Sequence, residues 1–360
     1  MSVGSTRIAL LAAGVLTCGL VAAPPATATT TLCPVARSMV SADQYWVANG
    51  PNQASNNWLN ATFQVGNLAM VRTTGVANHV TAPWAAANHY QLQSSTTQPF
   101  FPDFEAAGEA YLALQYFHPN PANLTALRDR VAAEVMSVQQ GHTTYWNYVD
   151  ALNMAMPSFA ELGVLDNSSA DLTTMHTLFE YTKTHLYDTQ VGLWYRDPSF
   201  VGSNTFWSRG NGWAFMAMTK VLAALPTTDP HRAEYVQVFQ RMAHALRPLQ
   251  RPDGLWNVDL TNPADHPGPE TSGTAMFTYG LAWGVNNGIL PAAVFTPIVQ
   301  RAWHGLTTVA LQPSGLLGYV QGVAGSPSGG QPVTASDTAA YGVGAFLLAG
   351  QQIAKLTPGC

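Results

Sequence analysis

The sequence predicts an all-α protein, an (α/α)6 barrel of six helical hairpins. Apolar residues recur with a helical period along nearly the whole chain, and the alternating β-branched runs typical of strands are scarce. Strongly apolar helical segments alternate with more polar ones. A helix that is apolar on every side must be surrounded by protein, whereas an amphipathic helix covers a surface. The alternation therefore indicates an inner ring of helices within an outer ring.

Six segments are rich in small apolar residues and are expected to be the inner helices. They are residues 58–71, 104–117, 149–162, 212–225, 273–285 and 341–354. The more polar stretches between them, expected to be outer helices, include residues 122–139, 170–186, 231–249 and 292–310. The chain beyond residue 28 allows about 55 residues for each hairpin, a usual size for such a repeat. An α-solenoid or two bundled helical domains are the alternatives.

The first 28 residues are predicted to be a secretory signal peptide. Arg7 precedes an apolar run over residues 8–23, and the small residues Ala26 and Ala28 frame a cleavage site. The run is shorter than the roughly 20 residues that a membrane-spanning helix needs, although an uncleaved anchor is the alternative. We therefore expect a secreted protein, extracellular or periplasmic, whose residues 29–360 form one catalytic domain without a membrane partner.

Cys33 and Cys360 are the cysteines left once the segment holding Cys18 is removed, and they are predicted to form a disulfide. An oxidising compartment permits the bond, and closing so long a loop is worth about 4–5 kcal/mol in the simplest entropic model. Two unpaired thiols are the alternative. Cysteines so far apart in the sequence do not indicate a metal site.

Composition excludes other classes. The chain is 47% hydrophobic, which is ample for a large core and excludes a disordered protein. Fifteen Lys and Arg against twenty Asp and Glu give a net charge of −5, and no basic run could follow a phosphate backbone. Nucleic acid is therefore not an expected partner, and we expect a monomer.

If the inner helices are parallel, their N-termini open together at one end of the barrel. The starts of these helices carry aromatic, carboxylate and amide side chains and one arginine, within residues 56–58, 101–103, 145–150, 207–213, 270–272 and 337–341. Aromatic faces stack on sugar rings, while hydroxyls need paired donors and acceptors. Helix N-termini also favour an anionic ligand. The pattern indicates a saccharide site.

Asp150 is the strongest candidate for a functional residue. It opens an otherwise apolar inner helix, where burial, and a second carboxylate from Asp103, would raise its pKa. Asp103, Ser272 and Asp337 could equally be ordinary N-caps, and Trp58 and Trp146 could be packing residues.

Residues 207–213 (WSRGNGW) form the most specific motif. The glycines on either side of Asn211 predict a tight turn with positive φ that projects Arg209 and Trp213 into the opening.

Several segments resemble glycoside hydrolase family 105, the unsaturated rhamnogalacturonyl hydrolases, and more distantly family 88, the unsaturated glucuronyl hydrolases. The resemblance rests on residues 148–157, on 192–197 continuing to 207–213, on 270–277 with Gly280 and Gly288, and on 341–349. It implies an (α/α)6 barrel that removes the unsaturated uronic acid left by a lyase at the non-reducing end of an oligosaccharide.

The resemblance also implies a mechanism and its residues. An acid protonates C4 of the enol ether, water adds at C5, and the hemiketal collapses; Asp150 would serve as acid and then base, with Asp103 as the second aspartate. Arg209 would pair with the uronate carboxylate and Trp213 would contact the substrate. The other expected substrate-binding residues are Tyr148, Asn211, Arg196, Trp146, Glu270, Ser272 and Tyr341. No metal or cofactor is expected.

Two positions depart from the family pattern and leave the sugar at the neighbouring subsite open. Tyr148 stands where the family often has Trp, and Arg196 stands where it often has His. Arg196 could add a second cation for a carboxylate or simply pair with Asp197 at the surface.

The sequence thus predicts a glycosidase that removes unsaturated galacturonyl residues from rhamnogalacturonan or other pectin oligosaccharides. One alternative is the same chemistry on unsaturated glucuronyl units of another polysaccharide. Others are a conventional inverting (α/α)6 glycosidase that uses Asp103 and Asp150, and a non-catalytic saccharide-binding barrel.

Overall fold

The computed structural model of the protein describes residues 32–77 and 80–360, so the predicted signal peptide, residues 1–28, lies outside the described residues. Twelve α-helices form within them. The inner helices are α2 (Trp58–Thr74), α4 (Ala106–Leu114), α6 (Ala151–Leu165), α8 (Ser208–Ala224), α10 (Thr271–Asn286) and α12 (Ala340–Leu356). The outer helices are α1 (Pro34–Asn49), α3 (Thr81–Ala87), α5 (Thr125–Gln139), α7 (Ser169–Leu186), α9 (Arg232–Leu246) and α11 (Ala292–Gly305).

Short elements connect these helices. Four are 3-10 turns, η1 (Pro102–Phe104), η2 (Pro121–Leu124), η3 (Pro198–Phe200) and η4 (Arg247–Leu249), and η5 (Leu306–Ala310) is a π-helical turn. Two antiparallel pairs of short strands join β1 (Tyr187–Asp188) to β2 (Leu193–Trp194) and β3 (Trp256–Asn257) to β4 (Pro269–Glu270).

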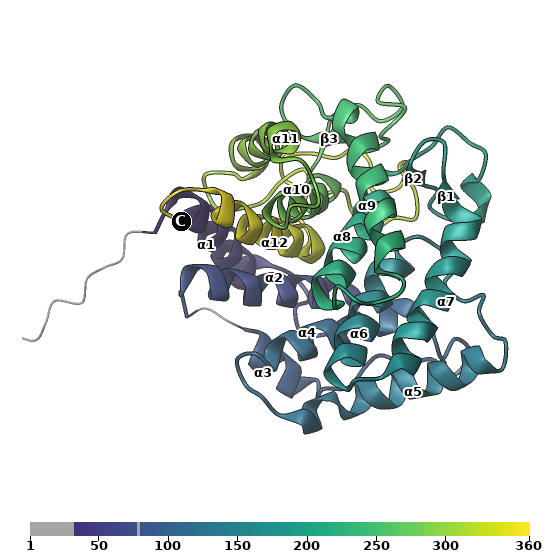
Figure 1. Cartoon of the computed structure of the whole chain (residues 1–360). Coiled ribbons are helices and arrows are strands. Elements are labelled where there is room, and N and C mark those ends of the chain that lie inside the picture. Colours follow the sequence, from purple (N-terminus) through teal and green to yellow (C-terminus); the bar gives the residue numbers. More distant parts are fainter. Residues whose placement is uncertain (1–31, 78–79) are drawn as a thin grey trace, which may run out of the picture. The chain divides into compact units, whose positions relative to one another are not determined.

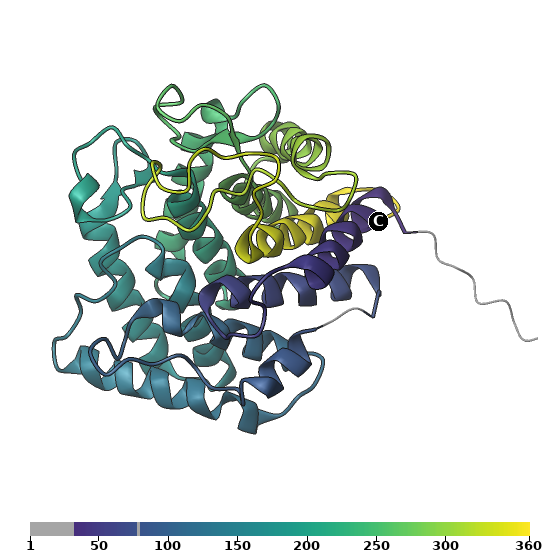
Figure 2. The same ribbon diagram turned by 180° about the vertical axis from the view of Figure 1, so that it is seen from behind.

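The inner helices form a closed ring. Each contacts the next in chain order, and α12 contacts α2, so the last inner helix packs on the first. The outer helices lie around this ring in Figures 1 and 2. The predicted (α/α)6 barrel is confirmed, because an open solenoid would not bring α12 against α2.

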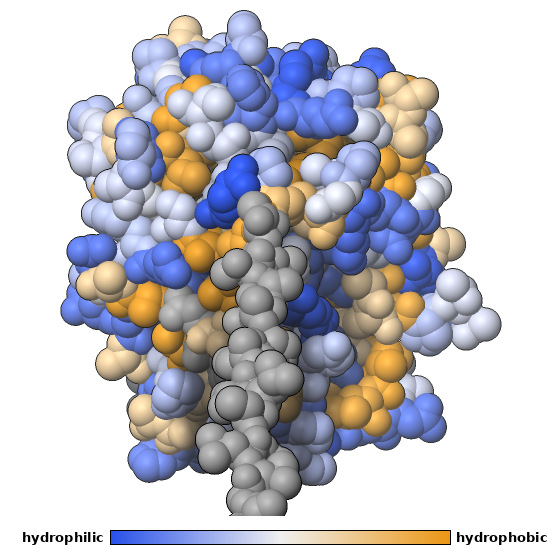
Figure 3. All heavy atoms as spheres, turned by 90° about the vertical axis from the view of Figure 1, so that its left-hand side faces the viewer, coloured by the Kyte–Doolittle hydropathy of each residue, from blue (hydrophilic) through white to orange (hydrophobic). Residues whose placement is uncertain are grey.

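Burial follows the predicted division between inner and outer helices. In α10 all residues from Thr271 to Gly284 are buried. In α9, by contrast, only a stripe at helical spacing is buried, made of Tyr235, Val238, Phe239, Met242, Ala243 and Leu246. The face shown in Figure 3 accordingly mixes hydrophilic and hydrophobic side chains. Among the described residues, no helix is long and apolar enough to cross a membrane.

Glycines permit close contacts between inner helices. A Cβ atom at Gly212 in α8 would lie 3.2 Å from the Cα of Gly273 in α10, and one at Gly66 would lie 2.4 Å from the carbonyl oxygen of Gly344. The predicted positive-φ turn around Asn211 is wrong. Both Gly210 and Gly212 lie inside α8, which begins at Ser208, and neither has a positive φ. The motif needs glycine for packing between helices.

The two ends of the described chain are joined. Cys33, the N-cap of α1, forms a disulfide with Cys360, as predicted, across 327 residues of sequence. Helix α1 packs on both α12 and α2. The disulfide therefore holds α1 in place over the contact between α12 and α2, where the inner ring closes.

The far end of the barrel, where the inner helices finish, holds a cavity of about 340 Å³ with buried charges. The Lys220 ammonium donates hydrogen bonds to the Glu109 carboxylate at 2.8 Å and to Asn153 Oδ1 at 3.1 Å. Burial, with a further contribution from Glu109, raises the pKa of Glu161 to about 8. An ionised Glu161 is therefore unfavourable in the folded state.

We predict that replacing both cysteines (Cys33→Ser with Cys360→Ser) lowers the free energy of unfolding by up to about 5 kcal/mol, because the cross-link restricts the unfolded chain. Urea unfolding with and without a reductant measures this effect. The wild-type protein should lose stability in reductant, whereas the double variant should not respond. Equal stability of the two proteins without reductant would contradict the prediction.

We also predict that Glu161→Gln stabilises the protein increasingly as the pH rises from 5 to 8. The folded-state pKa of Glu161 lies above the usual value near 4.3, so the folded state holds the proton more tightly and wild-type stability falls across this window. Melting temperatures against pH measure the difference. Asp166→Asn is a control that should give a constant offset, because Arg128 lowers the pKa of that carboxyl and it stays ionised throughout. If the difference in melting temperature between Glu161→Gln and the wild-type protein does not change with pH, the raised pKa of Glu161 is refuted.

Candidate active site

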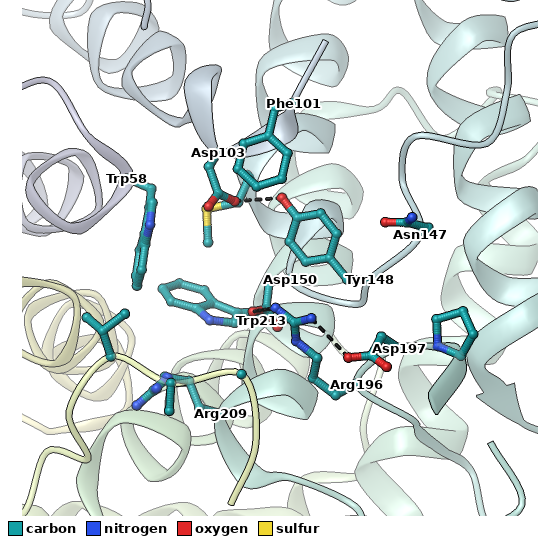
Figure 4. A pocket seen from close by; sticks show the side chains of 15 residues that line it. Trp58, Phe101, Asp103, Asn147, Tyr148, Asp150, Arg196, Asp197, Arg209 and Trp213 are labelled. Atoms are coloured by element: carbon teal, nitrogen blue, oxygen red, sulfur yellow. Dashed lines mark hydrogen bonds and ion pairs between the residues drawn. The ribbon is translucent and has the colours of Figure 1, made fainter. Parts of the chain in front are cut away.

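The N-terminal ends of α2, α6 and α8, together with η1 and two connecting segments, surround a cavity of about 590 Å³. Aromatic and charged side chains dominate its wall (Figure 4). It is lined by Trp58, Phe101, Asp103, Asn147, Tyr148, Asp150, Met154, Arg196, Asp197, Pro198, Arg209, Trp213, Val323, Ala324 and Gly325. Residues from α2, η1, the start of α6 and α8 thus meet in one place.

Asp150 is buried immediately before α6 and makes no capping hydrogen bond to that helix. Its Oδ1 atom has no hydrogen-bond partner within the part of the chain that the structure describes. Burial raises the pKa of Asp150 to about 6; Arg196 opposes this rise and Asp103 adds to it. A carboxyl group in this state exchanges a proton near neutral pH, as a general acid and base must.

Asp103 lies in η1 and pairs with Tyr148. The Tyr148 hydroxyl donates a hydrogen bond to Asp103 Oδ1 at 2.7 Å. Burial raises the pKa of Asp103, and the bond from Tyr148 works against that rise. Phe101 stacks on the Tyr148 ring, with the ring centroids 5.6 Å apart. The N-cap of α4 is Glu105, so the alternative in which Asp103 caps that helix does not hold.

Arg196 lies between two carboxylates at the charged side of the cavity. Its Nη1 atom donates to Asp197 at 3.0 Å, and its Nη2 atom lies 3.8 Å from Asp150 Oδ2. The guanidinium also lies over the Tyr148 ring, 5.1 Å from its centroid. The Arg196 carbonyl accepts a hydrogen bond from the Val149 amide at 2.8 Å, which fixes this segment beside Asp150. Arg196 therefore pairs with Asp197 and also lines the cavity.

Arg209 is almost completely buried, with 1% of its surface exposed, and the protein uses its terminal donors. Nη1 donates to the Gln321 carbonyl at 2.6 Å and to the Tyr341 hydroxyl at 3.2 Å, while Nη2 donates to the Gly322 carbonyl at 2.9 Å. Arg209 thus anchors the segment that carries Val323, Ala324 and Gly325 into the cavity wall. This role differs from the predicted contact with a substrate carboxylate.

Two tryptophans form the aromatic side of the cavity. Trp58 and Trp213 pack edge to face with centroids 5.9 Å apart, and Trp58 also lies 5.3 Å from the Tyr341 ring. Trp58 is partly exposed, and a tryptophan face exposed in a cavity can stack on a sugar ring. Trp213 lines the cavity but is 1% exposed, so its contact with the substrate stays a prediction.

Five predicted substrate-binding residues do not line the cavity: Trp146, Asn211, Glu270, Ser272 and Tyr341. All are buried, as Arg209 and Trp213 in the cavity wall also are, and their predicted contact with a substrate stays a prediction. Their contacts are internal. Trp146 packs on the Phe159 ring, and Asn211 forms hydrogen bonds with the backbone of Trp194. Glu270 caps α10 and accepts a hydrogen bond from the Ser272 hydroxyl. The Tyr341 hydroxyl accepts a hydrogen bond from Arg209 and donates one to the Gln321 carbonyl.

Several residues that line the cavity are absent from the predicted catalytic and substrate-binding residues. Trp58 and Phe101 belong to the aromatic helix starts, and Asp197 follows Arg196, so these had a recognisable pattern. Val323, Ala324 and Gly325 had none, because they reach the cavity through the long connection between η5 and α12, which crosses in front of the inner helices in Figure 2.

Outside the cavity, His176, Glu180 and Glu234 bring three possible metal-ligand atoms within 4.8 Å of one another. The Lys183 ammonium hydrogen-bonds the carboxylates of both Glu180 and Glu234. The cluster is therefore explained as an ion-pair network between α7 and α9.

Comparison with known proteins places the chain in a family. The model of Glycosyl Hydrolase Family 88 matches residues 34–357. The chain belongs to this family. The match spans almost all of the described barrel and confirms the resemblance seen in the motifs.

Two curated relatives are both named unsaturated 3S-rhamnoglycuronyl hydrolase. The relative from Formosa agariphila is 36% identical over 228 residues, or 60% of this chain and 59% of the relative. The relative from Alteromonas sp. (strain LOR) is 35% identical over 214 residues, or 58% of this chain and 51% of the relative. The chain thus matches between half and three fifths of the length of these relatives.

Solved structures agree over a greater length. A glycosyl hydrolase of family 88 from Bacteroides vulgatus has a TM-score of 0.84 and 33% identity, covering 90% of this chain and 99% of that protein. A protein titled a polysaccharide lyase has a TM-score of 0.84 and 32% identity, covering 91% and 98%. A possible member of family 105 from Salmonella enterica, at 19% identity and a TM-score of 0.77 over 89% and 94%, shares the fold.

We predict that Arg209→Met lowers the free energy of unfolding by about 3 kcal/mol, because the buried carbonyls of Gln321 and Gly322 lose a charged donor. Arg196→Met is the matched control. Its side chain is 25% exposed and its ion pair with Asp197 is near the surface, so the loss should be about 1 kcal/mol or less. Chemical unfolding of both variants tests this. Equal losses would contradict the anchoring role of Arg209.

Proposed function

We propose that the protein removes the unsaturated uronyl residue from the non-reducing end of pectin-type oligosaccharides, rhamnogalacturonan fragments above all, by hydrating the C4–C5 double bond. The observation that carries this proposal is the buried Asp150 carboxyl, with a pKa of about 6 and an unpartnered oxygen, beside a guanidinium in a cavity with an aromatic wall. The names of the two curated relatives support the same class of substrate.

In the proposed reaction the protonated Asp150 transfers its proton to C4 of the enol ether. Positive charge then develops at C5 and the ring oxygen, and the nearby Asp103 carboxylate stabilises it. Water adds at C5 and gives its proton to the Asp150 carboxylate, which restores the acid. The resulting hemiketal opens and releases the neighbouring sugar. One aspartic acid thus serves as acid and then as base.

Tyr148 prepares the second aspartate for this role. Its hydroxyl hydrogen-bonds Asp103, and Phe101 holds the phenol ring from the other side. The hydrogen bond opposes the rise in the pKa of Asp103 that burial causes, so it favours the charged carboxylate that the developing cation requires.

Export is part of the proposal. The apolar segment within residues 1–28 has the pattern of a signal peptide, and the Cys33–Cys360 disulfide suits an oxidising compartment.

A second candidate is β-elimination at a saturated uronate. The solved relative titled a polysaccharide lyase, 32% identical over 98% of its length, favours it. A guanidinium in the cavity could neutralise a uronate carboxylate in that reaction too. The two activities change ultraviolet absorbance in opposite directions, because hydration destroys the conjugated enol ether and elimination creates it.

We predict that the wild-type protein causes absorbance to fall with lyase-generated disaccharides and that Asp150→Asn lowers kcat by about 10³-fold or more, because the proton donor is lost. Asp166→Asn, a surface substitution outside the cavity, is the control and should keep the wild-type rate. A panel of unsaturated galacturonyl and glucuronyl disaccharides identifies the preferred substrate. A rise in absorbance with saturated uronyl oligosaccharides would favour the lyase, and near wild-type turnover by Asp150→Asn would end the assignment of Asp150.

A further inference from the structure

The cavity contains two arginines whose hydrogen-bonding states differ. The Nη1 and Nη2 atoms of Arg209 donate hydrogen bonds to the Gln321 and Gly322 carbonyls and to the Tyr341 hydroxyl. Arg196 has a single hydrogen bond to a side chain, from Nη1 to Asp197. Its Nε atom is buried without a hydrogen-bond partner among residues 32–77 and 80–360. Arg196 therefore retains unused donors that an anionic ligand in the cavity can satisfy.

The position of Arg196 relative to Asp150 matters as well. Nη2 lies 3.8 Å from Asp150 Oδ2, too far for a hydrogen bond but close enough for strong electrostatic coupling. Figure 4 shows the guanidinium between Asp150 and Asp197, below the Tyr148 ring. A planar carboxylate that binds Arg196 at this place would also bring a negative charge next to Asp150.

We infer that Arg196 determines specificity by receiving the ring carboxylate of the substrate, and that this contact cancels the positive charge facing Asp150, so that Asp150 holds its proton in the enzyme–substrate complex. The inference deepens the proposed hydration reaction and rests on it. The substrate would thereby help to protonate the group that attacks its own double bond.

The other charged and titratable groups around Asp150 are already balanced within the protein. Asp103 approaches it from η1 and is paired with Tyr148; Asp197 is paired with Arg196 itself. Arg209 approaches from α8 and is held by carbonyl groups. Arg196 opposes the rise in the pKa of Asp150 more strongly than Arg209 does. Of the charged groups around Asp150, Arg196 thus opposes its protonation most strongly.

The direct test compares an unsaturated uronyl disaccharide with its methyl ester, which has the same ring and double bond but an uncharged group that is larger by one methyl. We expect wild-type kcat/KM to favour the free acid by about 30- to 100-fold, the worth of a charge-assisted bidentate contact. In Arg196→Gln the ratio should fall to within about threefold of one. Arg196→Lys should keep an intermediate ratio, because it retains the charge and loses the bidentate geometry.

Arg209→Lys is the matched control, since it alters the other arginine of the cavity. It should lower kcat/KM for acid and ester by similar factors and leave their ratio unchanged. Melting curves establish that each variant is folded. The inference is overturned if Arg196→Gln keeps the wild-type ratio, or if the ratio collapses in Arg209→Lys instead.

The pH dependence of the wild-type protein supplies a test that needs no variant. Activity should fall as the pH rises through the pKa of Asp150, because the acid form is required; for the free enzyme, reported by kcat/KM, this pKa is about 6. With the free acid as substrate, the pH at which kcat falls to half its maximum should be about one unit or more higher than the corresponding pH for kcat/KM. With the ester as substrate, kcat and kcat/KM should fall at the same pH.

These measurements separate the inference from the proposed function. If neither the acid nor the ester loses its enol absorbance, the proposed hydration reaction fails. If both are consumed with equal kcat/KM and the same pH difference between the falls of kcat and kcat/KM, the hydration reaction stands and the role of Arg196 is refuted.

Discussion

Contact between the backbones of neighbouring inner helices is the constraint on which the active-site geometry depends. Glycines on facing helices, Gly212 against Gly273 and Gly66 against Gly344, leave no room for a side chain. These contacts hold α8 against α10 and α2 against α12, and so set where Arg209, Trp213, Trp58 and Tyr341 lie. A larger residue at either contact would move the helix starts, and hence the cavity wall, as rigid units.

A buried polar network transmits this geometry to the long connection before α12. Gln321 is fully buried, accepts a hydrogen bond from Trp207 and donates to the carbonyls of Ser326, Pro327 and Gly329. Glu270, which caps α10, accepts from the Gln321 amide, and Arg209 binds the Gln321 carbonyl. The predicted site residues that do not line the cavity, such as Glu270, thus position the connection that forms part of its wall. Their polar groups support one another, and each would be costly to leave unpaired.

The fold could be predicted because helical periodicity and the contrast between inner and outer helices are local properties of the sequence. The same regularity placed Asp103, Tyr148, Asp150 and Trp213 at one end of the barrel. It could not show which polar atoms other parts of the protein would occupy. The sequence offers both Arg209 and Arg196 as partners for a carboxylate. In the structure Arg209 donates to backbone carbonyls more than a hundred residues away, whereas the Nε atom of Arg196 has no hydrogen-bond partner among the described residues. Asn211 lies within a helix whose glycines resemble those of a turn, so its role was equally hidden.

The joined ends of the described chain have a topological consequence. With the Cα atoms of Cys33 and Cys360 5.5 Å apart, the polypeptide between them is in effect a covalent circle, and the six hairpins have no true first or last member. New termini could then be opened in a surface loop between any two hairpins, with a short peptide replacing the sulfur bridge, and the order of the helices around the barrel would be preserved. The position of the chain ends in this fold is therefore separable from the positions of the residues that surround the cavity.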